Sequence, residues 1–256
     1  MPMLWCKGEW CEEKEVVVSV RDRGLLHGMG VFETMLAIDG VIQHVEKHRR
    51  RLLHAVESMG LCDVSSYDFL RIGQELCEKN SCAYGRTRLR LTVTAGEGIL
   101  SHQFPGAAAT VWMTAEPLPS VSPTCSVLTL PWTRNERGAT VGMKTSSYAE
   151  NVLGLQWVRA QGAEEGIFFN TRDELCEACT ANVFVKLDGV WHTPRLGCGC
   201  LPGVMREVIL ERDSSIQESV ITRAQFLKVE EMFLTSAIRG VVPVSSCDGR
   251  EWQGSP

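Results

Sequence analysis

The sequence predicts a mixed α/β (α+β) protein built from two domains. Strand-like segments alternate with segments of helical spacing, and 256 residues suit one large or two small domains. A stretch at 116–123 holds three prolines in eight residues, which disfavour both a helix and a central strand. We therefore expect a smaller N-terminal α/β domain at 1–115, a linker at 116–123 and a larger C-terminal domain at 124–256.

Composition and charge narrow the classes of function. Hydrophobic residues make up 44% of the chain, an ordinary value for a globular protein. A net charge of −5 argues against nucleic acid or an anionic membrane as the main partner. We find no signal peptide and no run of about 18 apolar residues that would predict a membrane span. The eleven cysteines, an odd number at irregular spacing, suggest reduced thiols and a cytoplasmic location.

The first domain is expected to combine a sheet with two helices. The glycines of 21–30 predict a loop, and Asp39-Gly40 predicts a hairpin turn. Helical spacing and cap residues predict helices at about 48–59, ending at Gly60, and from a Ser65-Ser66 cap to about 79. Strands are expected at 15–20, 31–38, 41–42, 87–94 and 109–114.

The second domain is also expected to contain both strands and helices. The spacing of Tyr148, Val152 and Leu155 predicts a helix at 148–161 with these residues on its buried face. Further helices are expected from Gly203 onward and at 222–227. A loop is expected at 131–143, and strands at 125–130, 165–170, 181–187, 190–193, 231–235 and around Glu177.

Two residues of the second domain are candidates for chemistry. Lys144 follows a run of small residues and precedes the predicted helix, although a lone lysine in such a place more often faces solvent. Glu177 lies on a strand among Leu, Cys and Ala. A carboxylate in such surroundings needs either a buried cationic partner or a bound proton.

Two cysteine pairs have spacings similar to those of metal sites. Cys198 and Cys200 are too close in sequence for a zinc knuckle, and no histidine follows at ligand spacing. Cys176 and Cys179 are three residues apart, so on a strand they are expected to point to opposite faces. We therefore predict that these thiols pack in the interior and bind no metal.

The motifs together resemble the class IV aminotransferases, which are fold-type IV enzymes that use pyridoxal-5′-phosphate (PLP). That family includes branched-chain and D-amino-acid aminotransferases and 4-amino-4-deoxychorismate lyase. The resemblance implies a two-domain D-amino-acid-aminotransferase-like fold, PLP between the domains and a homodimer. It is carried, in order, by Arg21 to Gly24, Gly28 to Thr34, Asp39-Gly40, His48 to Leu52, Lys144, Glu177, Asn182 and Leu201 to Arg206.

The resemblance also implies roles for individual residues. Lys144 would hold the PLP aldehyde as a Schiff base and move a proton, and Glu177 would pair with the pyridine nitrogen. Arg51 would bind the phosphate together with backbone amides at a helix N-terminus. Those amides would come from Val204 and Met205. Thr235 and Ser236 lie close to the position of the family's second phosphate-binding hydroxyl, and Ala237 occupies the aligned place.

Substrate recognition is the least determined part of the site. The resemblance places Phe32, Thr34 and His102 near the substrate. Two arginines that anchor carboxylates in relatives are replaced by Leu36 and Leu100. Arg86, Arg88 and Arg90 share one polar strand face. We expect this face to be solvated, with Arg88 kept as a candidate substrate residue.

Three functions follow from the resemblance. The runs Thr193 to Leu196 and Gly203 to Arg206 favour an enzyme like 4-amino-4-deoxychorismate lyase, which eliminates pyruvate to give 4-aminobenzoate for folate synthesis. The alternative is an aminotransferase for branched-chain or D-amino acids. The third is a PLP-fold relative that binds without turnover, suggested by Leu36 and Leu100 and opposed by the intact Lys144 and Glu177.

Overall fold

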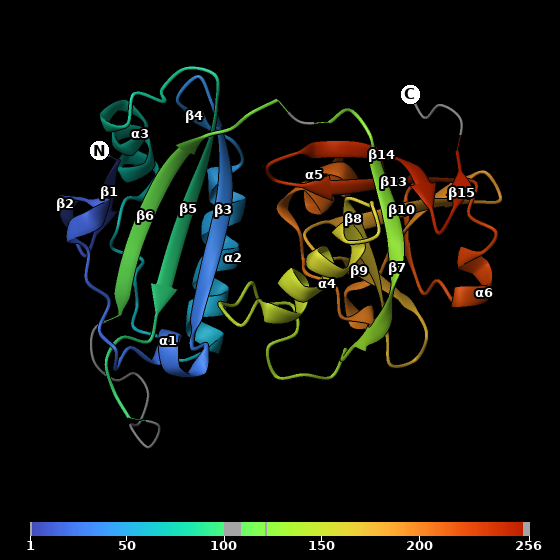
Figure 1. Cartoon of the computed structure of the whole chain (residues 1–256), viewed down its shortest axis with the longest axis horizontal. Coiled ribbons are helices and arrows are strands. Elements are labelled where there is room, and N and C mark those ends of the chain that lie inside the picture. The colour runs from blue at the N-terminus through green and yellow to red at the C-terminus, as the bar shows by residue number, and fades with distance from the viewer. Residues whose placement is uncertain (1, 100–108, 121, 253–256) are drawn as a thin grey trace. The chain divides into compact units, whose positions relative to one another are not determined.

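The computed structural model describes residues 2–99, 109–120 and 122–252, and the chain divides into two compact units (Figure 1). Unit 1 comprises Met1–Ser120 together with Lys144–Ser147. Unit 2 comprises Val121–Met143 and Tyr148–Pro256. The short segment that carries Lys144 therefore packs with unit 1, although it follows the proline-rich stretch in the sequence.

Unit 1 is built on a six-stranded antiparallel sheet in the order β2-β1-β6-β5-β3-β4. Its strands are β1 (Met3–Cys6), β2 (Glu9–Glu12), β3 (Gly30–Ile38), β4 (Val41–Ile42), β5 (Arg86–Thr94) and β6 (Thr110–Pro117). Its helices are the 3₁₀ helix η1 (Glu13–Glu15), α1 (Arg23–His27), α2 (Val45–Ser58) and α3 (Phe69–Lys79).

The period-2 pattern of β3 and β5 divides the sheet of unit 1 into two faces. Val31, Met35, Leu89 and Leu91 are buried, and α2 and α3 pack against the sheet. The alternate residues include Phe32, which lies opposite Thr92 on β5, and Thr34, which lies opposite Arg90. Figure 1 shows α2 running along β3. The expected Asp39-Gly40 hairpin is confirmed, because both residues have the positive φ that a tight two-residue turn requires.

Several predictions for unit 1 are wrong. Residues 16–20 form no strand, and Val17 and Val20 are exposed at 87% and 78% because no neighbouring strand or helix covers them. The predicted loop at 21–30 contains α1, which Asp22 caps by accepting a hydrogen bond from the Gly24 amide. Helix α3 begins at Phe69 after an Asp68 cap, whereas Ser65 is bonded to Asp63 in the preceding turn. The patterns of β1 and β2 are too short to predict.

Unit 2 is built on a nine-stranded mixed sheet with the path β12-β11-β10-β13-β14-β7-β8-β9, and β15 pairs with β14. The strands are β7 (Cys125–Arg134), β8 (Glu165–Asn170), β9 (Leu175–Ala178), β10 (Asn182–Leu187), β11 (Val190–Pro194), β12 (Gln217–Ser219), β13 (Glu231–Ser236), β14 (Gly240–Cys247) and β15 (Arg250–Glu251). The helices are α4 (Ala149–Arg159), η2 (Leu196–Cys198), α5 (Val204–Arg212) and α6 (Arg223–Phe226).

The sheet of unit 2 is covered on both faces by apolar clusters. One cluster includes Val127, Phe169, Val183 and Leu234 together with Phe226 of α6. The other includes Leu130, Phe168, Cys176 and Cys179 beneath Val158 of α4. The large apolar area removed from water on both faces stabilises this unit.

The predicted buried face of helix α4 is confirmed in part, because Leu155 packs against the apolar cluster of Leu130 and Phe168 but Val152 does not. Val152 is 46% exposed, whereas Asn151, Gly154 and Val158 are buried. Tyr148 is the N-cap residue, and its hydroxyl donates to the Cys179 carbonyl oxygen at 3.2 Å, as does the Asn151 side chain. These polar contacts, which helical spacing cannot reveal, set the rotation of the helix. Within the described ranges, no helix is long and apolar enough to cross a membrane.

Gly154 is required where α4 crosses the sheet. A Cβ atom at this position would lie 2.5 Å from Cys179 Sγ and 3.2 Å from Leu130 Cδ1. We predict that Gly154→Ala lowers the free energy of unfolding by about 1–3 kcal/mol through overpacking. Helix propensity alone would raise it by about 1 kcal/mol. Urea unfolding measures the sign, and a second Cys179→Ala change should restore part of the loss. A more stable Gly154→Ala protein would contradict this packing.

Candidate active site

Lys144 is held against strand β3 of unit 1 by backbone hydrogen bonds. The Phe32 amide donates to the Lys144 carbonyl oxygen at 2.9 Å, and the Ser146 amide donates to Gly30 at 2.8 Å. Thr145 forms an isolated bridge with Val31 between these two bonds. The half-buried Lys144 places its Nζ atom 4.4 Å from the centre of the Phe32 ring. The structure thus brings together Lys144 and Phe32, two of the predicted site residues.

The same sheet face carries the candidate substrate residues. The guanidinium carbon of Arg90 lies 3.9 Å from the Phe32 ring centre, and Arg90 lies opposite Thr34 across the strands. Arg88 forms an ion pair with Glu116 on the neighbouring strand β6. Arg90, rather than Arg88, is therefore the arginine beside Phe32 and Lys144. His102 lies outside the described residues.

The hydroxyl of Thr92 supports a ligand on this face. Thr92 is 4% exposed and lies opposite Phe32, and its Oγ1 atom has no hydrogen-bond partner among the described residues. A buried hydroxyl without a partner costs free energy, and a polar ligand could satisfy it.

Arg51 lies in a buried charged cluster of unit 1. Its Nε donates to Glu33 Oε1 at 2.8 Å and its Nη2 to Glu33 Oε2 at 2.6 Å, while His48 Nδ1 lies 2.7 Å from the same Oε2. Two parallel bonds hold the planar guanidinium in one orientation. Burial acts to raise the pKa of Glu33, but Arg51 and His48 together lower it to about 2. Glu33 therefore fixes the orientation of Arg51.

Glu177 of unit 2 is buried and held from two sides. It lies on β9 opposite Phe168 of β8, and its Oε2 atom accepts a hydrogen bond from the Leu201 amide at 2.8 Å. Its Oε1 atom lies 3.3 Å from Nη1 of Arg134, which ends strand β7. The sequence required either a cation or a proton here, and the structure supplies the cation.

The N-terminus of α5 presents backbone donors that could hold an anion in the same unit. Gly203 is its N-cap residue and provides no side-chain cap, so the amides of Val204, Met205 and Arg206 have no partner within the helix. A Cβ atom on Gly203 would overlap the amide oxygen of Asn182, whose nitrogen donates to the Leu201 carbonyl at 2.8 Å. Only glycine therefore fits where the chain enters the helix.

Thr235 is one of the two hydroxyls that the resemblance places close to the family's second phosphate-binding hydroxyl. It lies opposite Asn182 on β13, the strand against which α5 packs. It is 2% exposed, and its Oγ1 atom has no hydrogen-bond partner among the described residues. Ser236 instead accepts from the Arg239 amide at 3.1 Å. An orphan hydroxyl near helix amides fits a phosphate group, because phosphate oxygens accept hydrogen bonds from both.

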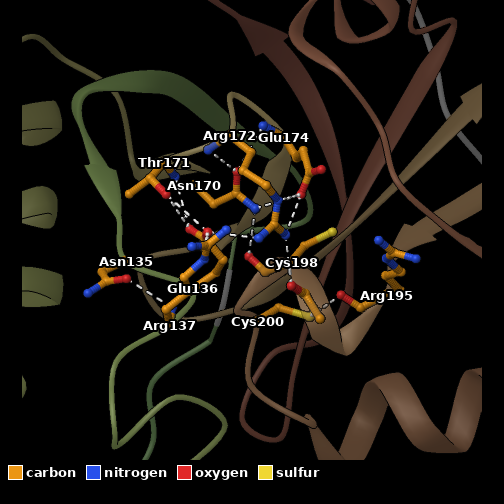
Figure 2. A network of polar contacts seen from close by, with 11 residues as sticks. Asn135, Glu136, Arg137, Asn170, Thr171, Arg172, Glu174, Arg195, Cys198 and Cys200 are labelled. Atoms are coloured by element: carbon orange, nitrogen blue, oxygen red, sulfur yellow. Dashed lines mark hydrogen bonds and ion pairs between the residues drawn. The ribbon is translucent and has the colours of Figure 1, made fainter.

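A polar network fixes the loops around this site (Figure 2). Glu136, with 1% of its side chain exposed, accepts from the Thr171 amide and hydroxyl and pairs with Arg172 at 2.8 Å. Arg172 also pairs with Glu174 at 2.7 Å and donates to the Gly197 carbonyl at 3.0 Å. Hydrogen bonding to Arg172 is the main reason that the pKa of Glu174 falls to about 2. The network joins three loops, one of which leads to Leu201.

The four cysteines of the two motif-like pairs are all buried. The β8–β9 ladder shifts register between Phe168 and Phe169, so Cys176 and Cys179 lie in one cluster with Phe168. The expectation that they point to opposite faces is wrong because of this bulge. Burial raises the pKa of Cys179 and of Cys200 to about 12, which keeps these thiols neutral. Within the described ranges, no cluster of three or more His, Cys, Asp or Glu side chains could hold a metal.

Comparison with known proteins identifies the family. The model of the amino-transferase class IV family matches residues 30–247, and the chain belongs to that family. These enzymes use PLP, and the residues of unit 2 fit its ring nitrogen and phosphate.

Relatives with different activities match nearly the whole chain. A putative branched-chain-amino-acid aminotransferase of Methanocaldococcus jannaschii is 28% identical over 96% of this chain and 88% of its own. An aminodeoxychorismate lyase of Bacillus subtilis is 26% identical over 96% of this chain and 87% of its own. A D-alanine aminotransferase of Bacillus licheniformis is 28% identical over 95% of this chain and 87% of its own. The fold matches a PLP-bound hypothetical aminotransferase of Mycobacterium tuberculosis with a TM-score of 0.88, at 23% identity over 99% of this chain and 94% of that one.

The Glu33 cluster predicts a specific dependence of stability on pH. Because the pKa of Glu33 falls from 4.5 to about 2 on folding, its contribution is complete above pH 4.5 and is lost as the pH falls toward 2. We predict that Glu33→Gln lowers the free energy of unfolding by about 3–5 kcal/mol at neutral pH, since it removes the buried carboxylate that holds the Arg51 guanidinium through two hydrogen bonds.

Urea unfolding between pH 2 and 6 measures this effect. The difference between parent and Glu33→Gln should shrink below pH 4.5. Glu116→Gln, which removes an exposed partner of Arg88, is the control and should show no such narrowing. A constant difference across this range would contradict the assignment.

Proposed function

We propose that the protein is a PLP-dependent lyase that eliminates pyruvate from 4-amino-4-deoxychorismate and releases 4-aminobenzoate. The observation that carries this proposal is the loss of carboxylate anchors at Leu36 and Leu100 beside an otherwise complete cofactor set. An aminotransferase acts on a carbon that bears both an amine and a carboxylate. In the lyase substrate the carbon that bears the amine carries no carboxylate, so these two anchors are dispensable.

The residues of the chain divide the chemistry among them. Bound PLP supplies an aldehyde for the substrate amine and a ring that accepts negative charge. Lys144 would take the proton from the carbon that bears the amine. The bond from the neighbouring ring carbon to the enolpyruvyl oxygen would then break, so that the substrate ring becomes aromatic and the departing enolpyruvate takes up a proton and leaves as pyruvate. Glu177 holds the proton of the ring nitrogen. In unit 2, Thr235 and the amides of Val204 and Met205 would bind the phosphate, and the phosphate-binding role that the resemblance implies for Arg51 of unit 1 stays a prediction.

We assign substrate binding to the sheet face of unit 1 that carries Phe32, Thr34 and Arg90. Phe32 would contact the substrate ring. Arg90 would bind a carboxylate of the substrate, and the Thr92 hydroxyl would form a hydrogen bond with one of its polar groups. We include a homodimer and a cytoplasmic location in the proposal. Support for the location comes from the eleven cysteines, all of which are free thiols as a reducing compartment requires.

The assignment of Lys144 is tested by chemical trapping. Borohydride reduction of the PLP-loaded protein should fix the cofactor on the peptide that contains Lys144, as measured by mass spectrometry. Lys144→Ala should lose the label, whereas Lys186→Ala, which removes a lysine paired with Glu231, should keep it. A label on another lysine of the parent would refute the assignment.

The reaction type is tested with single substrates. In the absence of a 2-oxo acid, an aminotransferase converts bound PLP completely to pyridoxamine phosphate with its amino acid. We predict little such conversion with branched-chain L-amino acids or with D-alanine, and we predict formation of 4-aminobenzoate from 4-amino-4-deoxychorismate. Rapid stoichiometric conversion by an amino acid would establish the aminotransferase alternative. Inertness toward all of these substrates would favour a relative that binds without turnover.

A further inference from the structure

Arg134 lies beneath Glu177 across three adjacent strands of unit 2. It ends β7, after a register shift in the β7–β8 ladder between Thr129 and Thr133. Its guanidinium carbon is 4.1 Å from the centre of the Phe168 ring, and Phe168 lies directly opposite Glu177. The bulge thus re-aims the end of β7 and brings a cation to the buried carboxylate.

The polar contacts of Arg134 are with two carboxylates, Glu177 at 3.3 Å and Glu150 at 3.2 Å. Arg206 differs in that it pairs with one carboxylate, Glu218, and also donates to the Pro194 carbonyl at 2.9 Å. Its bond to the backbone holds a loop in place, whereas both of these contacts of Arg134 are electrostatic contacts with acids.

The low solvent exposure of Arg134 strengthens the interaction of its charge with neighbouring charges. Its side chain is 16% exposed, and its buried Nη2 atom has no hydrogen-bond partner among the described residues. A charge that is shielded from water interacts more strongly with its neighbours than a solvated one. The contacts and the burial together point to an electrostatic role toward Glu177.

We propose that Arg134 is a positioning residue that keeps Glu177 ionised and thereby keeps the proton on the cofactor's ring nitrogen. The proposal rests on the proposed function, in which Glu177 is the partner of that nitrogen. The proton can reside either on the nitrogen, beside an anionic Glu177, or on Glu177, beside a neutral ring.

Electrostatics decides between these two states. The Arg134 guanidinium directly contacts the Glu177 carboxylate. Its attraction to the ionised carboxylate would therefore outweigh its repulsion of the protonated cofactor ring, which would be bound by that same carboxylate. Arg134 therefore favours the state with a protonated ring, which is the better acceptor of negative charge. Glu150 is 45% exposed, so it offsets only part of the charge on Arg134.

The experiment uses PLP labelled with ¹⁵N at the ring nitrogen and bound to the full-length protein. The chemical shift of this nitrogen reports its protonation directly, without turnover. We expect Arg134→Met to move the resonance toward that of the unprotonated ring and to lower kcat about tenfold with little change in KM, the scale typical of residues that orient a reacting group. Arg134→Lys should restore the parental resonance, because it restores the charge.

A double-mutant cycle separates this role from a structural one. Glu177→Gln should move the resonance in the same direction, and adding Arg134→Met to it should cause little further change. Arg137→Met, which removes a neighbouring arginine that is 78% exposed, should leave the resonance unchanged. Arg134→Gln, which keeps polar atoms but no charge, answers the same question if Arg134→Met does not fold.

The two proposals fail in different ways. If Glu177→Gln leaves the resonance unchanged, Glu177 is not the partner of the ring nitrogen and the proposed function loses that residue. If Glu177→Gln moves it but neither Arg134→Met nor Arg134→Gln does, only the role of Arg134 is overturned. Equal effects of Arg134→Met with and without Glu177 would show a structural role and would also overturn it.

Discussion

The buried charge of Glu177 is the constraint on which much of unit 2 depends. A carboxylate with 9% of its side chain exposed must be compensated, and its two oxygens find compensation in different segments of the chain. Arg134 reaches one oxygen from the end of β7, and the Leu201 amide reaches the other from the loop before α5. The position of that loop in turn determines where Gly203 starts the helix. The acid that would hold the cofactor ring and the amides that would hold its phosphate are therefore placed by one set of contacts.

The network around Glu136 extends the same dependence to the loops. Arg172 joins the turn after β7, the β8–β9 hairpin and the segment at 195–198. Because Glu136 is almost fully buried, breaking one of its bonds would leave a charged group without compensation. Unit 2 thus combines a rigid apolar core with a second set of constraints made from charges. These ion pairs hold the loops in fixed positions, which the loops cannot reach through the backbone hydrogen bonds of a helix or a sheet.

The residue patterns predicted the elements that are long and periodic and missed those that depend on partners. Strands β3 and β5 and helices α2 and α3 follow from alternation and helical spacing, whereas β14 has no pattern that distinguishes it before its neighbours β13 and β7 are known. Lys144 and Glu177 are recognisable because their types are unusual in their surroundings. Arg134 was not recognisable, because its role arises from a bulge in β7 and from a neighbour on another strand. The resemblance named Thr235 and Ser236 together, and only the hydrogen bonds of the structure separate them, since Ser236 accepts from the Arg239 amide and Thr235 Oγ1 has no partner among the described residues.

The two units differ in how their candidate site residues are held. In unit 2, Glu177 and the loop that leads into α5 are held by a buried ion pair and a backbone hydrogen bond, so changes there would damage the fold as well as the site. In unit 1, Phe32, Thr34 and Arg90 lie on strands whose register is set by backbone pairing along the whole length of β3 and β5. Replacing these side chains would therefore leave the backbone pairing in place. On the proposed function, a change of substrate would come from this sheet face, while the acid proposed to pair with the ring nitrogen would keep its partners in unit 2.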